Sequence, residues 1–405
     1  MRIIIALDSF KESMSATVAV ASAAAGIRAA HPAVTCLEAP ISDGGEGLLD
    51  VLIPVLGLET ISVEVLDAYG ELRTASYGLN PATGMAVIEV AQAIGLEHVP
   101  PHRRRILQAS SAGVGQLLKD AHERGARDFL IGLGGTATSD GGIGAFLELG
   151  GSVMTSAGSA DAFDARALQE ISSINLPDLS SWANTTVTLA CDVSNPLTGA
   201  TGAAQVFAPQ KGASPEEVQL LDLLLGRWGQ LVEDATGVQV VHAAGAGAAG
   251  GLGAFFLGFF GAMFKPGIDI VLDAIGLDDL LPSADLVITG EGKIDAQTCH
   301  GKAPWGVLQR ARVQRVPVIA VCGKREDGVE HLIGDAAFLD IVPISDPSVS
   351  LPQSLKEGPE RIAQTCAQIV SRWMDRACGA GGHWHTLQQA TQEGIRKQPQ
   401  EEELP

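Results

Sequence analysis

The sequence contains few aromatic residues and few positive charges. Aromatic residues make up 4% of the 405 positions, and 27 lysines and arginines stand against 47 acidic residues, which gives a formal net charge of −20. A chain this acidic is a poor partner for nucleic acid or for an anionic membrane surface. We therefore expect no nucleic-acid partner. Because cations are scarce, a lysine placed among glycines indicates a ligand more strongly than it would in a basic protein.

Paired cysteines and long hydrophobic runs are also missing. The six cysteines form no C-x-x-C pair and no Cys/His spacing of a metal site, which is typical of a protein in a reducing compartment. The apolar run that ends at Leu7 is too short for a signal peptide, and the stretch from Gly253 to Phe264 is too short for a membrane span. We expect a soluble cytoplasmic protein without a membrane partner.

Hydrophobic residues make up 46% of the sequence, enough for large cores, and the length predicts two or three domains. Apolar strands alternate with helices near both ends of the chain, whereas strand-like segments between residues 61 and 90 are separated by turns and indicate antiparallel hairpins. We predict an α/β protein in which both chain ends build a Rossmann-like parallel-sheet domain (1–60 and 275–378). A second α/β domain (61–274) is inserted between them, and residues 379–405 form a disordered tail.

The first predicted strand, Ile3–Leu7, is a continuous apolar run, as expected for a parallel strand that is buried on both faces. The other predicted strands are Val34–Ala39, Ile61–Leu66, Arg73–Tyr77, Met85–Val90, Asp128–Ile131, Val187–Ala190, Val238–Val241, Asp285–Thr289, Val316–Val321 and Phe338–Val342. The predicted helices are Ser15–Ala30, Gly47–Leu56, Ser111–Arg124, Pro215–Asp234, Pro304–Arg312 and Gly358–Cys378.

Four apolar stretches run directly into turns made of glycines, small hydroxyl residues and carboxylates. Glycines let backbone N–H groups close on an anion, and a following helix N-terminus adds a partial positive charge. Carboxylates in the same turns would repel a bare phosphate, but they suit a phosphate that arrives with Mg²⁺. The combination predicts phosphoryl transfer. The turns are Ser42–Gly47, Gly132–Gly142, Cys191–Pro196 and Thr289–Asp295.

Each of these turns also has a purely structural explanation. Asp43 and Asp192 could cap helices, and the segment that follows residue 289 could be an exposed loop of mixed charge. Three glycines and two acids within five residues from Asp43 nevertheless favour a ligand, because glycine costs backbone entropy unless the chain needs it. At the end of the first strand, Ser9 could cap the next helix, while Lys11 is a suitable phosphate partner at the ligand edge of a parallel sheet.

One motif indicates a different function. The run from Gly245 to Gly250 matches the dinucleotide pattern G-x-G-x-x-G, and Asp269 follows at about the right distance. Alanine- and glycine-rich sequence produces this pattern by chance, so the signal is weak. An NAD-dependent oxidoreductase of a small hydroxy acid is therefore the first alternative. A non-catalytic binder of a small phosphorylated acid is the second.

Taken together and in order, the turns resemble those of the bacterial type I glycerate kinase family, and the resemblance runs from Met1 to about Ala377. It implies the two-domain α/β fold of that family and phosphorylation of D-glycerate by ATP with Mg²⁺, the 2-phosphate being the favoured product. It leaves open whether the protein is a homodimer. The matching stretches are Asp8–Ser13, Ser42–Gly47, Gly132–Gly142, Cys191–Leu197, Pro209–Gly212, Gly245–Gly253 and Thr289–Asp295.

Phosphoryl transfer depends on positioning and on charge stabilisation. We expect the ATP phosphates to rest on Gly134–Thr138 and Gly290–Gly292, and Asp192 to deprotonate the attacking hydroxyl. Lys11 and Lys211 would neutralise the transferring phosphate or the glycerate carboxylate, and the expected metal ligands are Glu291, Asp295 and Asp43. The residues expected to bind substrate or ATP are Ser9, Asp43, Gly44, Gly45, Glu46, Gly134, Gly135, Thr136, Thr138, Asn195, Gly290, Gly292, Lys293 and Lys302.

Overall fold

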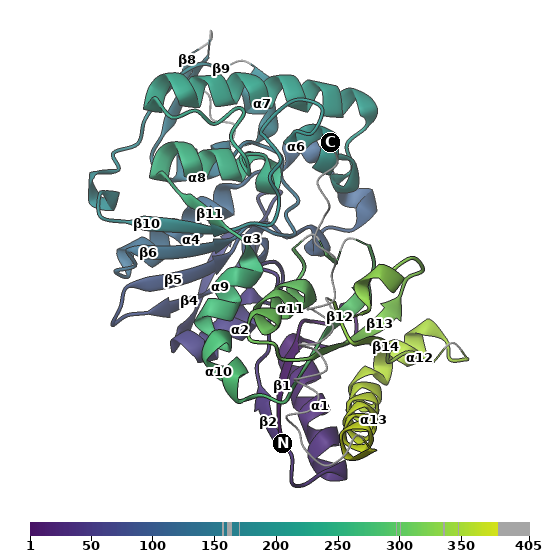
Figure 1. The fold of residues 1–405 in the computed structure, drawn as a ribbon. Coiled ribbons are helices and arrows are strands. Elements are labelled where there is room, and N and C mark those ends of the chain that lie inside the picture. Colours follow the sequence, from purple (N-terminus) through teal and green to yellow (C-terminus); the bar gives the residue numbers. More distant parts are fainter. Residues whose placement is uncertain are drawn as a thin grey trace, which may run out of the picture. The chain divides into compact units, whose positions relative to one another are not determined.

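The computed structural model describes residues 1–155, 158–159, 164–169, 171–296, 298–299, 301–334, 337–346 and 348–379. The chain divides into two compact units (Figure 1). Unit 1 consists of Met1–Asp43 and Val271–Pro405, and unit 2 of Gly44–Ile270. The predicted tail lies outside the described residues except for Gly379, which ends the last helix. Within the described ranges, no helix is both long enough and apolar enough to span a membrane.

Unit 1 is built on a five-stranded sheet to which both ends of the chain contribute. Every pair of neighbouring strands is parallel, which confirms the predicted α/β class. The run Ile3–Leu7 is fully buried, as its unbroken apolar character predicts. In spatial order the strands are β14 (Asp340–Pro343), β13 (Val318–Arg325), β12 (Leu286–Ile294), β1 (Arg2–Leu7) and β2 (Thr35–Glu38).

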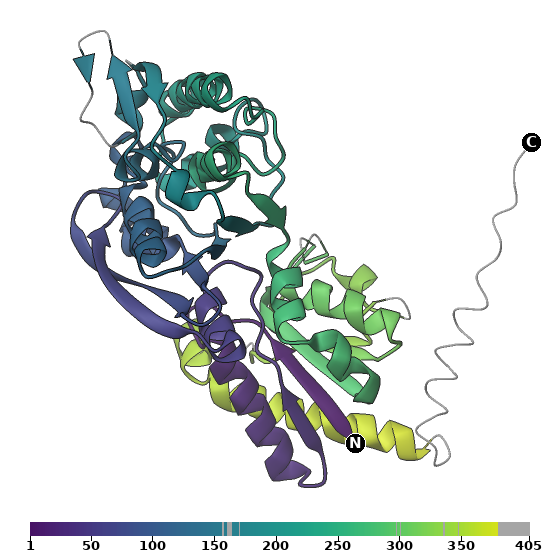
Figure 2. The ribbon, with the colours of Figure 1, turned by 90° about the vertical axis from the view of Figure 1, so that its left-hand side faces the viewer.

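Two long helices from opposite ends of the sequence pack together in unit 1. Helix α1 (Ala16–Ala30) lies beside α13 (Gly358–Gly379), which Figure 2 shows as the purple and yellow helices. Their apolar side chains join those of Ile3, Ile5 and Leu7 in one core. The other helices of this unit are α10 (Leu277–Leu280), α11 (Ala303–Val313) and α12 (Leu351–Lys356).

Unit 2 contains a six-stranded mixed sheet. Its first three strands form antiparallel pairs, as the turns between them predict, and the rest of the sheet is parallel. Glu89, Gly132, Ala190 and Lys265 pair in one row at the carboxyl ends of four parallel strands. In spatial order the strands are β11 (Met263–Lys265), β10 (Thr186–Ala190), β6 (Asp128–Gly132), β5 (Met85–Glu89), β4 (Leu72–Asn80) and β3 (Glu59–Leu66).

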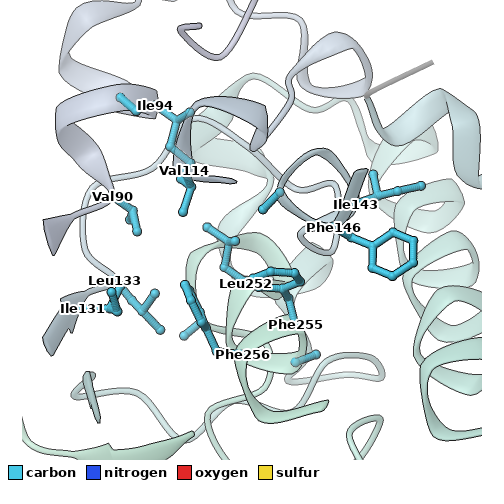
Figure 3. Close-up of a cluster of buried hydrophobic side chains, with 14 of the residues drawn as sticks. Val90, Ile94, Val114, Ile131, Leu133, Ile143, Phe146, Leu252, Phe255 and Phe256 are labelled. Carbon is cyan, nitrogen blue, oxygen red and sulfur yellow. The ribbon is translucent and has the colours of Figure 1, made fainter. Parts of the chain in front are cut away.

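Helices cover this mixed sheet and enclose the larger apolar core. Figure 3 shows side chains of that core, among them Ile131, Val114 and Phe255. A capping box at Ser214 and Glu217 starts α7, the longest helix of the unit. The helices are α2 (Leu48–Leu56), α3 (Ala91–Ile94), α4 (Ala112–Glu123), α5 (Ile143–Glu148), α6 (Ala203–Phe207), α7 (Pro215–Thr236) and α8 (Leu252–Phe260). Helix α9 (Gly267–Ala274) begins in unit 2 and continues past Ile270, where the chain enters unit 1. A small antiparallel sheet adds β7 (Ser152–Thr155), β8 (Gly158–Ser159) and β9 (Ile171–Asn175).

The compact units divide the chain at different places from the predicted domains. The prediction put the boundaries after residues 60 and 274, whereas the units divide after Asp43 and Ile270. The first boundary lies earlier because α2 belongs to unit 2, where the N–H of Leu49 donates to the carboxylate of Glu89 on β5. The segment Val238–Val241, predicted as a strand, joins no sheet, and its N–H groups at positions 240 and 241 donate to Glu233 instead.

Candidate active site

The carboxyl edge of the unit 2 sheet brings together three of the four predicted turns. A Cβ at Gly44 would lie 2.6 Å from Gly267 Cα, and a Cβ at Gly134 would lie 3.0 Å from Gly45 Cα. Only glycine permits these close approaches, and the backbone at Gly44 is also left-handed, with a φ of 91°. The turn that holds Gly44, Gly45 and the exposed Glu46 therefore packs on Gly134 after β6, on Ala190 at the end of β10 and on Gly267 after β11.

Asp192 lies exposed just beyond β10. Its Oδ1 accepts a hydrogen bond from the N–H of Gly267 at 3.0 Å, so Asp192 caps the first turn of α9 and its orientation is fixed. Asn195 has a local task as well, because its side-chain amide donates to the carbonyl of Thr201 at 2.7 Å. The structure thus shows capping and turn stabilisation for this segment and leaves the Asp192 side chain at the surface.

The loop that follows β6 exposes its glycines and buries its hydroxyl groups. Gly135 is exposed with a φ of 68°, and Gly134 is partly exposed. Thr136 and Thr138 are buried, and the Thr138 hydroxyl has no hydrogen-bond partner. The sequence predicts that both hydroxyls face a ligand. In the structure, the accessible part of the loop is the backbone of its two glycines.

Lys211 is buried rather than available at the surface. Its side chain is 3% exposed, and its Nζ donates to Thr136 Oγ1 at 3.1 Å and to the carbonyl of Thr138 at 2.6 Å. Burial lowers the pKa of Lys211 to about 7, against the opposing influence of the Asp140 carboxylate. The expected contact between this ammonium and a ligand is replaced by contacts with the loop itself.

Glu89 is a buried carboxylate at this edge that the sequence analysis missed. It ends β5 beside Gly132, and burial raises its pKa from 4.5 to about 7, although the hydrogen bond from Leu49 acts in the opposite direction. An acidic residue directly after an interior parallel strand was the signal that singled out Asp192. Because β5 was predicted as part of an antiparallel hairpin, the same signal was overlooked at Glu89.

In unit 1, the predicted loop Gly290–Ile294 is the second half of strand β12. It pairs with β13 as far as Ile294 and Arg325. A Cβ at Gly290 would lie 2.1 Å from the carbonyl oxygen of Val321, and one at Gly292 would lie 3.3 Å from the backbone nitrogen of Lys11. The two glycines therefore allow close packing between neighbouring chain segments, which corrects the expectation of a loop at this position.

The acids that follow β12 are paired with lysines. Lys302 Nζ lies 3.4 Å from Glu291 Oε2 and 3.2 Å from Asp295 Oδ1, and Lys293 Nζ lies 3.3 Å from Asp295 Oδ2. Glu291 also accepts a hydrogen bond from the Thr298 hydroxyl at 3.1 Å. Burial raises the pKa of Glu291 to about 7, with Lys302 acting in the opposite direction. Four predicted residues, Glu291, Lys293, Asp295 and Lys302, thus form one charged cluster.

Asp8, at the end of β1, is a second carboxylate that the sequence analysis did not select. Its Oδ1 accepts the N–H of Ser9 at 2.6 Å. Burial, together with the carboxylates of Asp43 and Glu291, raises the pKa of Asp8 from 3.8 to about 8, although the N–H of Ser9 and the exposed Lys11 act in the opposite direction. The carboxylate of Asp8 is therefore near enough to those of Asp43 and Glu291 to be repelled by both.

This acidic group is the place in unit 1 that suits a divalent cation. Mg²⁺ prefers carboxylate oxygens and keeps several water ligands, and a bound cation would relieve the repulsion that raises the pKa of Asp8. Among the residues the structure describes, however, no three acidic, histidine or cysteine side chains are already arranged to hold a metal ion. The chemistry of the donors fits Mg²⁺, while their arrangement requires water or a ligand to complete the coordination.

Comparison with known proteins identifies the family of the chain. The model of the glycerate kinase family matches residues 3–374. The chain belongs to the glycerate kinase family. It is 40% identical to a glycerate kinase of Bacillus subtilis (strain 168) over 91% of this chain and 98% of the relative. It is also 40% identical to glycerate 2-kinase of Escherichia coli (strain K12), over 92% of this chain and 97% of the relative.

A solved structure of the glycerate kinase family shows the same fold. The crystal structure of a protein described as glycerate kinase 2 from Salmonella typhimurium LT2 matches with a TM-score of 0.81 and 38% identity, over 93% of this chain and 98% of that chain. The predicted fold class is therefore confirmed. Membership of the family also confirms that the chain is a kinase, an enzyme that transfers a phosphoryl group.

The dinucleotide-like run of this kinase has a structural explanation. A Cβ at Gly247 would lie 2.3 Å from the carbonyl oxygen of Pro196, and one at Gly250 would lie 2.1 Å from that of Thr138. These glycines let the run pack closely against the segments that follow β10 and β6. The run therefore supports the carboxyl edge of the sheet, and its match to a cofactor motif carries no argument for an oxidoreductase.

Proposed function

We propose that this chain phosphorylates D-glycerate at O2 with ATP, giving 2-phosphoglycerate and ADP, and that it uses Mg²⁺ as cofactor. Membership of the glycerate kinase family supports the substrate class, and the Escherichia coli relative named glycerate 2-kinase supports the position. The structural observation that carries the proposal is the carboxyl edge of the unit 2 sheet, where glycine turns and Asp192 lie together.

The glycine turns of unit 2 are suited to an anionic ligand. Gly44, Gly45, Gly134 and Gly135 place main-chain groups at the edge of the sheet without side chains to block a ligand, and the first turn of α2 follows directly. We assign the binding of phosphate or carboxylate oxygens to these backbones, with Glu46 at the rim. Thr136 and Thr138 contribute to the shape of the loop from the inside.

Asp192 is our assignment for the group that orients and deprotonates the attacking hydroxyl. Its exposed carboxylate is held by the N–H of Gly267, which fixes one oxygen and thereby directs the side chain. A general base must lie within hydrogen-bond reach of the hydroxyl proton and must keep a defined direction. Asn195 supports this role by fixing the segment that follows β10.

Unit 1 carries basic and polar side chains of the kind that bind phosphate. Lys11, Lys293 and Lys302 provide cations, and Ser9 provides a hydroxyl group near Asp8. When bound with ATP, Mg²⁺ neutralises charge that develops on the phosphate oxygens. The residues that would hold it are four acidic residues of this unit, Asp8, Asp43, Glu291 and Asp295.

The test is a phosphorus NMR assay of purified protein with ATP, Mg²⁺ and D-glycerate, with a matched sample that lacks glycerate. Phosphate on O2 couples to the single proton on C2 and gives a doublet, whereas phosphate on O3 couples to two protons and gives a triplet. A new doublet together with ADP supports the proposal. A triplet overturns the assigned position. Binding of glycerate without any phosphorylated product overturns catalysis and leaves a binding protein.

A further inference from the structure

An acidic and a basic side chain, Asp140 and Lys211, are both buried behind the glycine loop of unit 2. Asp140 has no exposed surface, and Lys211 is 3% exposed. Charged side chains are rarely buried to this extent because their removal from water is costly unless hydrogen bonds and opposite charge compensate. Neither residue lies at the surface where a ligand arrives. Their function must therefore follow from the groups to which they form hydrogen bonds.

Asp140 holds the starts of two helices. One of its carboxylate oxygens accepts hydrogen bonds from the N–H and the hydroxyl of Ser111, at 2.8 and 2.7 Å, and from the N–H of Gly144, at 3.2 Å. The other accepts the N–H of Gly142, also at 3.2 Å. Ser111 precedes α4 and Gly142 precedes α5. A single carboxylate thus joins both helix N-termini to the end of the loop.

Lys211 holds the middle of the same loop. Its two hydrogen bonds reach Thr136 Oγ1 and the carbonyl of Thr138, residues more than seventy positions earlier in the chain. Gly250 packs against the same carbonyl from another direction, and its own carbonyl accepts the N–H of Gly141 at 3.0 Å. The Thr136–Ser139 segment is therefore fixed from its interior side by buried groups.

The front of the loop is fixed through its backbone. Gly135 accepts a hydrogen bond from the N–H of Leu96 at 2.7 Å, and Ala137 donates to the carbonyl of Ile94 at 2.8 Å. With both sides of the loop fixed, Gly134 and Gly135 are presented in a single backbone geometry. Groups fixed in advance are the kind that stabilise a developing charge without reorganising during the reaction.

We infer that Lys211 and Asp140 are positioning residues, which hold the Thr136–Ser139 segment from inside unit 2 so that Gly134 and Gly135 keep the geometry that phosphoryl transfer requires. The inference rests on the proposed function only in its expected effect on kcat. In this role Lys211 contacts the loop and does not contact the ligand directly. The inference also adds Asp140, which lies in the predicted turn Gly132–Gly142 but is not among the predicted site residues.

Trp228 provides a reporter of the loop that is independent of activity. Its indole N–H donates to the carbonyl of Gly141 at 2.8 Å, and the ring is buried against that residue. Protein labelled with 5-fluorotryptophan gives one fluorine resonance for each tryptophan, and the Trp228→Phe variant identifies the resonance of interest. The spectrum is recorded without ligand, at a temperature where circular dichroism shows every variant folded.

The main variant is Lys211→Met, which keeps an unbranched stem and removes the ammonium. Thr136→Val removes one of the two hydrogen-bond acceptors of Lys211, so it tests the same contact if Lys211→Met does not fold. Asp140→Asn tests the contribution of Asp140. Lys119→Met, an exposed lysine on α4, is the matched control. We expect Lys211→Met, Thr136→Val and Asp140→Asn to shift the ligand-free Trp228 resonance and to lower kcat by about 10- to 100-fold, since small displacements of positioned groups have effects of this size.

The outcomes separate positioning from direct contact. Combined Lys211→Met and Thr136→Val changes should lose little more activity than the worse single change, because the contact that Thr136→Val removes is already lost in Lys211→Met. An unchanged ligand-free resonance with a large loss of kcat would mean that Lys211 touches the ligand, and it would overturn the inference. A kcat within twofold of the unsubstituted protein in Lys211→Met and Thr136→Val would also overturn it. If the unsubstituted protein does not phosphorylate glycerate, the proposed function fails, and the fluorine spectra alone decide the inference.

Discussion

Glu89 and Leu49 are joined by a hydrogen bond of 2.7 Å, in which the N–H at the start of α2 donates to the buried carboxylate at the end of β5. This bond connects the turn that carries Gly44 and Gly45 to the row of strand ends in unit 2. The backbone that we assign to ligand binding is therefore held by a side chain whose own ionisation is perturbed. The arrangement makes both stability and the geometry of the turn dependent on pH.

In the Glu89→Gln variant, the free energy of unfolding should depend less on pH than in the parent protein. The pKa of Glu89 is raised from 4.5 to about 7, so the folded protein retains this proton more tightly than the unfolded chain. The free energy of unfolding therefore falls as pH rises from 4.5 to 7, by up to about 3 kcal/mol from this group. Glutamine can still accept from Leu49 but does not ionise. Urea titrations at several pH values should show the variant gaining stability relative to the parent across this range, while Glu123→Gln, an exposed control, follows the parent.

The Asp192→Asn variant separates capping from proton transfer. Asparagine can accept the N–H of Gly267 and is a good cap, but it is a poor base. We expect kcat to fall by about 10²–10⁴-fold with little change in Tm. Asp192→Ala should show the same kinetic loss and in addition lose about 1 kcal/mol of stability, because the cap is removed. Steady-state kinetics and thermal unfolding of both variants provide the measurement, and a loss of less than tenfold for Asp192→Asn would rule out the assignment as base.

The magnesium assignment is tested by removing Mg²⁺ with a chelator and by replacing an acidic residue of unit 1. We expect EDTA to abolish phosphoryl transfer and added Mg²⁺ to restore it. Glu291→Gln should raise the Mg²⁺ concentration needed for half-maximal rate, because one anionic oxygen donor is lost. Glu326→Gln is a suitable control, since Glu326 pairs with Lys324 and Lys293 and is not among the proposed ligands. Identical magnesium dependence in Glu291→Gln and Glu326→Gln would contradict the assignment.

Alanine substitutions at Gly290 and Gly292 should differ in their effect on stability. The Gly290→Ala methyl group would meet the carbonyl oxygen of Val321 at 2.1 Å, between two buried strands, whereas the nearest atom to Gly292→Ala lies at 3.3 Å. Overpacking of a rigid interior costs roughly 1–3 kcal/mol, so we expect a loss of at least this size for Gly290→Ala and a smaller one for Gly292→Ala. Urea denaturation gives the comparison. Equal stability of the two variants would show that the strand pair adjusts more easily than its packing indicates.

Local sequence signals anticipated much of the fold. The apolar run from Ile3 to Leu7 predicted a fully buried strand, and the capping box that begins at Ser214 lies where the long helix starts. The ends of parallel strands predicted where Asp192 and the glycine turns would gather. These features depend on neighbours in the sequence or on a general rule for parallel sheets, so a single sequence contains them.

The remaining features depend on contacts between distant segments. Lys211 is buried because Thr136 and Thr138 receive its hydrogen bonds, whereas lysine is ordinarily exposed. The strand β12 continues through Gly290 and Gly292 because β13 pairs with it there, although glycine disfavours strands. Glu89 was overlooked because its strand is antiparallel to one neighbour and parallel to the other. None of these pairings can be read from local composition.

The position of β1 in the sheet of unit 1 affects how the chain is made on a ribosome. Residues paired between β1 and β12 are separated by about 283 positions, as the bond between Arg2 and Asp285 shows. When Gly44–Ile270 has been synthesised, the six-stranded sheet has all its members, but the apolar strand near the N-terminus still lacks a neighbour on one side. An unpaired apolar strand is prone to associate with other chains. The nascent protein therefore needs protection at its first strand, by a chaperone or by rapid translation, until Leu286–Ile294 leaves the exit tunnel.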